Sequence, residues 1–353
     1  MEQFSMISQK DIARQCGVSL ITVSRALDPL RQDNVKSATW KKILEICAKE
    51  NFYPNFSARA LASGCTRSVG LIVPGIGMIS NSPPSAIYLE SFNNELEKAG
   101  YNMLLLPVSG SDWESISRNA EPLILSNRCD GYVTVAFSVD LPGELPVTVL
   151  QTTAAGKITD NRYPVISINN HPAMCAMAEH LKTQQYRKPL FITFNDGSVE
   201  RIHQWQEAFQ NSGFPQLETL NLSPARINYS GDAAMLKVLK SHLEEIKKFD
   251  IWVFSNDQWA LLAAELMELE NISPGKDIAI IGFDNIEKDH PDARISTISP
   301  PLKEFGCKAA QTVLEKIKNR KKDFTNTRSE LNSQAIFRVS SCKNKFSTNP
   351  KEI

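Results

Sequence analysis

The chain has 353 residues, which is too long for one compact hydrophobic core, so two or three domains are expected. Apolar residues make up 42% and charged residues 22%, a globular composition that excludes a disordered, collagen-like or disulfide-scaffold protein. No stretch approaches the roughly 20 uncharged apolar residues of a membrane helix, and the N-terminus lacks the pattern of a signal peptide. We therefore expect a cytoplasmic protein with no membrane partner.

The net charge is zero, but it is unevenly distributed. Residues 1–67 hold ten Lys and Arg against six Asp and Glu, so the rest of the chain is slightly acidic. A basic head on an acidic body fits an anionic partner at one end. A solvated surface would give the same pattern.

Three short helices are expected in the N-terminal 51 residues. Ser8 followed by Asp11 has the spacing of a capping box, and Gly17 ends the first helix. Ser19 is a good N-cap for a second helix, and a third is expected over 37–51. A helix, a glycine-containing turn and a second helix form the helix-turn-helix arrangement, whose second helix lies in the major groove of DNA.

The start of that second helix carries the side chains that would face the base edges, which are Leu20, Ile21, Thr22, Ser24 and Arg25. Arg25 is suited to two parallel hydrogen bonds with guanine. Leu20 and Ile21 are apolar, and thymine methyl groups could be their partners. The alternative is that these two residues close a small core.

From Ser68 the pattern changes to alternating strands and helices, which predicts parallel sheets with helices on both faces, arranged as two lobes. The expected strands are 69–73, 103–108, 132–137, 147–150, 165–168, 190–194, 251–254 and 278–283. The expected helices are 86–99, 113–126, 173–183, 199–211, 232–247, 260–270 and 303–318. The polar tail is expected to be frayed.

Several motifs resemble those of the LacI/GalR bacterial transcription repressors, in the same order and spacing. They are Asp11-Ile12-Ala13, Gly17-Val18-Ser19, Thr22-Val23-Ser24-Arg25, Tyr53-Pro54-Asn55, Leu61-Ala62, Arg67 to Pro74, Asp130-Gly131, Ser255 to Ala260 and Ile280 to Asp284. The resemblance implies an all-α helix-turn-helix head with a hinge helix, then an α/β periplasmic-binding-protein-like (type I) effector domain of two lobes, in an obligate homodimer.

Domain boundaries follow from the resemblance and the predicted elements. The head is expected over 1–53, the hinge over 54–66, the effector and dimerisation domain over 67–343 and a flexible tail over 344–353. Within the effector domain, the inner lobe is expected over about 67–167 plus 300–326. The outer lobe is expected over about 168–299 plus 327–343.

The resemblance also implies which residues contact DNA. Residues 20, 21 and 25 occupy base-reading positions, and residues 55–63 correspond to a hinge helix that is too short to be stable alone in water. Leu61 matches a leucine that enters the minor groove, and Ala58 matches the small residue where two hinge helices meet. The alternative for Leu61 is a linker residue packed on the body. The full set is Ser8, Ser19, Leu20, Ile21, Thr22, Ser24, Arg25, Tyr53, Asn55, Ala58, Arg59 and Leu61. The expected partner is a pseudo-palindromic double-stranded operator with one half-site per subunit.

A ligand site is expected where the carboxyl ends of the strands of the two lobes face each other. By resemblance, Arg201 matches a ligand-binding arginine, with Trp205 four residues later, and Asn256 and Asp284 match polar ligand contacts. Tyr229 stands where an aromatic ring can stack on a sugar. Gln151 stands where many sugar-binding members carry an acid. Such groups suit a ligand with several hydroxyls, a sugar or a sugar derivative. A surface salt bridge for Arg201 and a strand-end turn for Asp284 remain alternatives.

The sequence therefore predicts a ligand-controlled transcription regulator, a repressor rather than an enzyme, without a cofactor or a metal. Its departures from the family pattern, Gln151 among them, leave a ligand-independent regulator with a degenerate pocket as the alternative. A solute-binding protein would leave the DNA-reading head unexplained. A dehydrogenase would use the turn at Gly75 and Gly77, but Ser80 occupies the last glycine position of the dinucleotide fingerprint.

Overall fold

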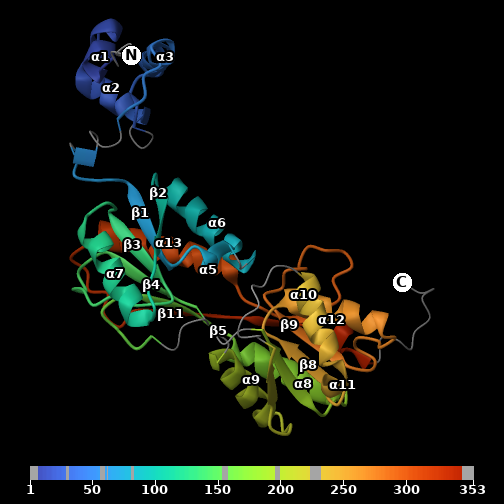
Figure 1. The fold of residues 1–353 in the computed structure, drawn as a ribbon. Coiled ribbons are helices and arrows are strands. Elements are labelled where there is room, and N and C mark those ends of the chain that lie inside the picture. The colour runs from blue at the N-terminus through green and yellow to red at the C-terminus, as the bar shows by residue number, and fades with distance from the viewer. Residues whose placement is uncertain are drawn as a thin grey trace.

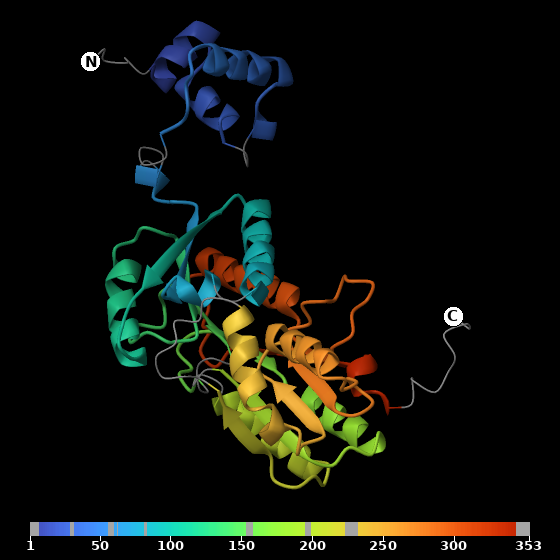
Figure 2. The ribbon, with the colours of Figure 1, turned by 45° about the vertical axis from the view of Figure 1, so that its right-hand side comes forward.

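The computed structural model describes residues 7–28, 32–55, 60–61, 63–80, 83–152, 158–194, 199–222 and 232–343. A small helical head stands at one end and is followed by two α/β lobes, each built on its own sheet (Figure 1). In the turned view, one segment of the polypeptide joins the head to the nearer lobe (Figure 2). We call the nearer lobe the inner lobe and the farther one the outer lobe. The predicted tail lies outside the described residues.

The head contains α1 (Gln9–Cys16), α2 (Leu20–Ala26), the short 3-10 turn η1 (Gln32–Asn34) and α3 (Ser37–Lys49). The capping box between Ser8 and Asp11 begins α1 as predicted, and Gly17 ends it in the left-handed conformation with φ +70°. One fully buried residue from each α-helix, Ile12, Val23 and Ile43, forms the core of the head.

The inner lobe is a six-stranded parallel sheet in the order β11-β5-β4-β3-β1-β2. Its strands are β1 (Ser68–Pro74), β2 (Asn102–Val108), β3 (Gly131–Val135), β4 (Val147–Gln151), β5 (Val165–Asn169) and β11 (Arg328–Asn332), and its helices are α5 (Gly77–Ser80), α6 (Pro83–Lys98), α7 (Trp113–Leu125) and α13 (Leu302–Lys318). Because side chains alternate along a strand, Leu71 faces α6 and α13 while Ile72 faces α7.

The outer lobe has the sheet order β12-β10-β9-β8-β6-β7, in which only β12 is antiparallel to its neighbour. Its strands are β6 (Pro189–Thr193), β7 (Glu218–Asn221), β8 (Ile251–Phe254), β9 (Ala279–Phe283), β10 (Ser296–Ser299) and β12 (Gln334–Ile336). Its helices are α8 (His171–Thr183), α9 (Val199–Asn211), α10 (Asp232–Ser241), α11 (Leu243–Ile246), α12 (Asp257–Leu269) and the 3-10 turn η3 (Val339–Ser341). Helices α8 and α9 cover one face of this sheet, and α10, α11 and α12 cover the other.

Among the described residues, the chain passes between the lobes after β5, after β10 and after β11. The last passage differs from the expected boundary at residue 327, because β11 still pairs with β5 in the inner sheet, with Arg328 opposite Val165. The passage falls at Ser333, whose main-chain N–H donates to Asn169 O at 3.0 Å and whose hydroxyl donates to Asn170 Oδ1 at 2.7 Å. In the part of the chain that is described, no helix is both long and apolar enough to span a membrane.

Candidate DNA-binding surface and ligand site

The N-terminus of α2 presents apolar side chains to solvent. Ser19 caps the helix by accepting a hydrogen bond from Thr22 N at 3.1 Å, which fixes the first turn. Leu20 and Ile21 follow directly and are 47% and 63% exposed. The alternative that these two residues close a small core is therefore wrong, because the core of the head forms without them. Arg25 is also exposed, one turn farther along the helix.

Other predicted DNA contacts have different local roles. The hydroxyl of Ser8 lies 2.6 Å from Asp11 Oδ2 and accepts a hydrogen bond from Asp11 N at 3.3 Å, so it caps α1. Ser24 is exposed, whereas Thr22 is half-buried with its hydroxyl 2.9 Å from that of Ser19. The hydroxyls of Ser8, Ser19 and Thr22 therefore bind within the first turns of α1 and α2.

The segment that leads from the head to the inner lobe is partly described. Tyr53 is 83% exposed and Asn55 is also exposed. Leu61 is 88% exposed, so the alternative in which it packs on the body is not observed. The predicted contacts Ala58 and Arg59, and most of the predicted hinge helix, lie outside the described residues.

In the outer lobe, Arg201 of α9 extends to the carboxyl ends of β8 and β9. Its guanidinium carbon lies 3.7 Å from the centroid of the Phe283 ring, and its Nη1 donates a hydrogen bond to the carbonyl of Ser255. Its desolvation lowers the pKa of the guanidinium, which the carboxylates of Asp284 and Asp257 partly oppose. A guanidinium stacked on a core ring is not the surface salt bridge that was the alternative.

Asp284 follows β9 directly and faces the same region. Its main-chain N–H donates to Ile298 O at 2.9 Å and so ends the pairing of β9 with β10, and its φ of +102° then bends the chain, so its backbone does form a strand-end turn. Desolvation raises the pKa of its carboxyl to about 7, against the opposing attraction of Arg201. The turn and the electrostatic link to Arg201 are therefore both present.

Asp257, which was not among the predicted site residues, is the first residue of α12 and is 1% exposed. Its Oδ2 accepts a hydrogen bond from Ile286 N at 2.9 Å, which ties α12 to the loop after β9. Burial raises the pKa of this carboxyl to about 7. The available signal was its position directly after Asn256 at a strand end.

Two other predicted ligand contacts of the outer lobe lie in the described part of the chain, and both bind or pack within the protein. Asn256 caps α12, because its Oδ1 accepts a hydrogen bond from Trp259 N at 3.0 Å. The prediction for Trp205 does not agree with its position, because this side chain is 0% exposed and stacks on Phe209 in the core under α8 and α9. The four-residue spacing puts Trp205 on the same face of α9 as Arg201, and in the fold this face packs against the sheet. Tyr229 lies outside the described residues.

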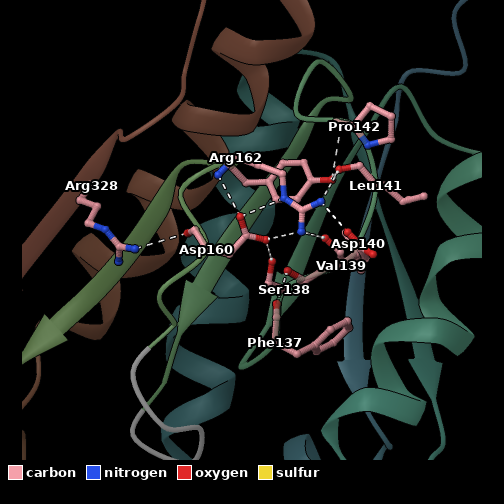
Figure 3. Close-up of polar contacts among 11 residues, drawn as sticks. Phe137, Ser138, Val139, Asp140, Leu141, Pro142, Asp160, Arg162 and Arg328 are labelled. Carbon is pink, nitrogen blue, oxygen red and sulfur yellow. Dashed lines mark hydrogen bonds and ion pairs between the residues drawn. The ribbon is translucent and has the colours of Figure 1, made fainter.

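Gln151 stands at the end of β4 in the inner lobe, where its Oε1 accepts a hydrogen bond from Ile158 N at 3.1 Å. Figure 3 shows the network that holds the neighbouring loops: Arg162 binds Asp160 at 2.9 Å and Asp140 at 2.6 Å, and Arg328 donates to Asp160 O at 3.3 Å. Arg328 also donates to Ile158 O at 2.9 Å, next to the main-chain N–H that binds Gln151. Gln151 is thus part of a loop scaffold that sequence reasoning did not detect. No group of three or more His, Cys, Asp or Glu with metal-binding geometry is found in the described ranges.

Two family models match the chain. Residues 8–55 match the bacterial regulatory proteins of the lacI family, and residues 178–341 match the periplasmic binding protein-like domain. The sucrose operon repressor of Escherichia coli is 26% identical over 292 residues, which cover 80% of this chain and 85% of that protein. The HTH-type transcriptional regulator RegA of Clostridium saccharobutylicum is 27% identical over 331 residues, covering 89% and 93%.

Solved structures are similar over almost the whole length. The lac repressor dimer bound to operator and the anti-inducer ONPF has a TM-score of 0.71 at 17% identity and covers 95% of this chain and 99% of its own. The complex of the transcriptional regulator CelR with cellobiose has a TM-score of 0.60 at 17% identity, with the same coverage. At these identities the likeness shows the fold. The predicted fold class, a helix-turn-helix head followed by a two-lobed periplasmic-binding-protein-like domain, is confirmed.

Proposed function

The chain belongs to the LacI family of bacterial regulatory proteins, and from this premise we propose that it represses transcription by binding a pseudo-palindromic operator through its head. The observation that carries the proposal is the apolar pair Leu20 and Ile21, exposed at the capped start of α2 beside Arg25. Apolar groups at the N-terminus of a recognition helix gain burial against thymine methyl groups, and arginine reads guanine. Acting on the chromosome, the protein works in the cytoplasm, and we propose no catalytic role.

A homodimer supplies the second head that a two-fold operator needs. The hinge segment around residues 55–63 orders on DNA when paired with its counterpart, and Leu61 enters the minor groove as a wedge. Its 88% exposure among the described residues supports this role, because a leucine that is so exposed has apolar surface left for a partner. Such a wedge unstacks a base step and bends the duplex, at a cost of a few kcal/mol that the extra contacts offset.

The effector is a small molecule with several hydroxyls, a sugar or a sugar derivative, held between the two lobes. Arg201 and Asp284 together present a planar donor and a carboxylate acceptor, the pair that adjacent hydroxyls bind. Ligand binding changes the closure of the lobes and the placement of the inner lobes across the dimer, and thereby the operator affinity. The coupling is reciprocal, so an effector that weakens DNA binding is itself bound less tightly by the DNA complex.

The test starts from random double-stranded DNA, from which the purified protein selects its operator at moderate salt. We expect an enriched two-fold symmetric sequence, and loss of its selective binding in Arg25→Ala and Ile21→Ala. Arg118→Ala removes the same charge from the exposed surface of α7, far from the head, and should bind as the unmodified protein does. Absence of any preference over random competitor, with or without candidate metabolites, would overturn the proposal.

A ligand-independent regulator is the second candidate, and two contacts favour it. The side-chain oxygens of Gln151 and Asn256 both accept main-chain hydrogen bonds within the protein, which reduces their capacity for a ligand. Calorimetry against a panel of sugars and phosphosugars separates the two candidates. Heat of binding from any member supports the effector site, whereas none, with intact operator affinity, supports the second candidate.

A further inference from the structure

The end of the linker is fastened to the inner lobe by one carboxylate. Asp130, 7% exposed and directly before β3, accepts hydrogen bonds from Thr66 N at 2.8 Å, from the Thr66 hydroxyl at 3.0 Å and from Arg67 N at 2.8 Å. The Cys65 thiol donates to the same carboxylate at 2.8 Å. Residues 65–67 are therefore held against the edge of the inner sheet where β1 begins.

The main chain of Arg67 is bound to Asp130, and its side chain extends from there to the head. Its Nη1 and Nη2 donate to Asp28 Oδ1 and Oδ2 at 2.8 and 2.9 Å, a bidentate pair whose side chains are only 21% and 12% exposed. Two parallel hydrogen bonds between a guanidinium and a carboxylate fix the relative orientation of the two groups as well as their distance. This pair is also largely shielded from water.

Asp28 is in turn fixed to the recognition helix. It follows the C-cap residue of α2, Leu27, and its main-chain N–H donates to Arg25 O at 3.2 Å. Arg67 itself has a φ of +50°, a left-handed conformation that residues other than glycine rarely adopt and that persists where its surroundings determine it. Here its main-chain N–H is bound by a carboxylate of the inner lobe and its guanidinium by a carboxylate of the head.

We propose that Arg67 is a positioning residue for operator recognition, because it links the orientation of α2 directly to the inner lobe. The inference rests on the proposed function, in which two inner lobes in a dimer hold two heads. With the Arg67–Asp28 pair in place, the distance between the two inner lobes in the DNA-binding state of the dimer also sets the distance between the two recognition helices. The protein then accepts one spacing of operator half-sites and rejects others. Without the pair, each head moves on its linker and tolerates several spacings.

The experiment uses the full-length protein, the operator it selects, and versions of that operator with base pairs inserted or removed between the half-sites. We expect Arg67→Gln and Asp28→Asn to lose about tenfold in affinity at the preferred spacing, which corresponds to one charged hydrogen-bonded pair. At altered spacings they should lose much less, so the ratio between preferred and altered spacing falls. Arg67→Lys keeps the charge without the fork and should also lower that ratio.

Controls separate positioning from folding and from the proposed function. A single base change within one half-site should cost the variants as much as it costs the unmodified protein, because each head still reads bases. Equal weakening at every spacing, or an unchanged spacing ratio, would overturn the positioning role, as would an Arg67→Lys variant that behaves like the unmodified protein. If the unmodified protein itself selects no operator, it is the proposed function that fails.

Discussion

The guanidinium carbon of Arg201 lies over the ring of Phe283, 3.7 Å from its centroid, at the carboxyl edge of the outer sheet. Phe283 is 2% exposed and is packed in the core under α8 and α9. The guanidinium therefore contacts a ring whose position is fixed by the core. Cation–π attraction of a desolvated group contributes on the order of 1–2 kcal/mol. The ring contact and the hydrogen bond to the Ser255 carbonyl hold the guanidinium at the ends of β8 and β9.

Replacing Arg201 with Lys should abolish or strongly weaken effector binding while leaving operator binding intact. A lysine cannot stack on Phe283 or offer a planar pair of donors, so we expect at least a tenfold loss of ligand affinity, about 1.4 kcal/mol. Calorimetry with the effector found in the sugar panel, and operator titration with and without it, measure the two effects. Arg118→Lys is the matched control, and equal ligand affinity in Arg201→Lys would contradict the assignment.

Replacing Leu61 with Ala should weaken specific operator binding by about tenfold, because the apolar wedge and the bend it supports are lost. The stability of the body should not change, since this side chain is 88% exposed. Operator titration and thermal unfolding measure the two effects. Leu269→Ala, which removes a side chain that is 77% exposed on α12, is the matched control. An unchanged operator affinity would refute the wedge.

The buried carboxyl of Asp257 should make the protein less stable as pH rises. Its pKa is raised by burial from 3.8 to about 7, so the folded state favours the protonated form. The stabilisation is complete below the unfolded pKa and is lost as pH rises through about 7. Asp257→Asn should therefore have a flatter stability profile than the unmodified protein between about pH 4 and pH 8.

Denaturant unfolding at several pH values measures this profile. Asp284 contributes in the same direction, because its pKa is also raised to about 7, so the single variant removes only part of the slope. Asp289→Asn changes a side chain that is 89% exposed and should leave the slope unaltered. A profile in Asp257→Asn as steep as that of the unmodified protein would show that this carboxyl is not the source.

Lys316 should make the inner lobe more stable as pH rises above neutrality. This residue of α13 is 2% exposed, its ammonium donates to Gly143 O at 2.7 Å, and burial lowers its pKa from 10.5 to about 8. Because the folded state disfavours the charged form, the penalty is complete below about pH 8 and disappears as pH approaches the unfolded value.

Lys316→Met should accordingly stabilise the protein at neutral pH by about 1–2 kcal/mol, since it replaces a buried charge with an apolar group of similar length. Thermal unfolding at neutral pH gives the difference, and Lys318→Met, at the exposed end of the same helix, should change little. Destabilisation by Lys316→Met would mean that the hydrogen bond to Gly143 O and the contact with the Tyr163 ring, 5.1 Å away, outweigh the burial of charge.

Elements with a regular apolar pattern were predicted within a few residues, and elements without one were not. Helix α9 has the predicted bounds, Val199–Asn211, and β8 has its predicted bounds, Ile251–Phe254. The edge strands β7, Glu-Thr-Leu-Asn, and β11, Arg-Ser-Glu-Leu-Asn, were missed. Both are largely exposed and become strands because a neighbouring strand supplies hydrogen-bond partners, a cause that lies outside their own residues.

The residues of the candidate site also divide into those that the sequence placed correctly and those that it did not. Position after a strand correctly placed Asp284 and Asn256 at one edge of the outer sheet, because every parallel strand delivers its next residues to the same edge. It was insufficient for Trp205, since the spacing along α9 does not say which side of the helix faces the sheet. It was also insufficient for Gln151, whose partner Ile158 comes from a loop without periodicity.

What the sequence by itself determined is most of the succession of helices and strands, the capped helix pair with apolar residues at the start of its second helix, and the family. These depend on local propensity, on capping and on the repeat of apolar residues along one element. Only the tertiary structure decided that Arg67 spans from Asp130 to Asp28, that Arg201 rests on Phe283, and that β11 remains in the inner sheet. Each of these pairs residues far apart in the chain, and their contact depends on how whole elements pack, which no local pattern encodes.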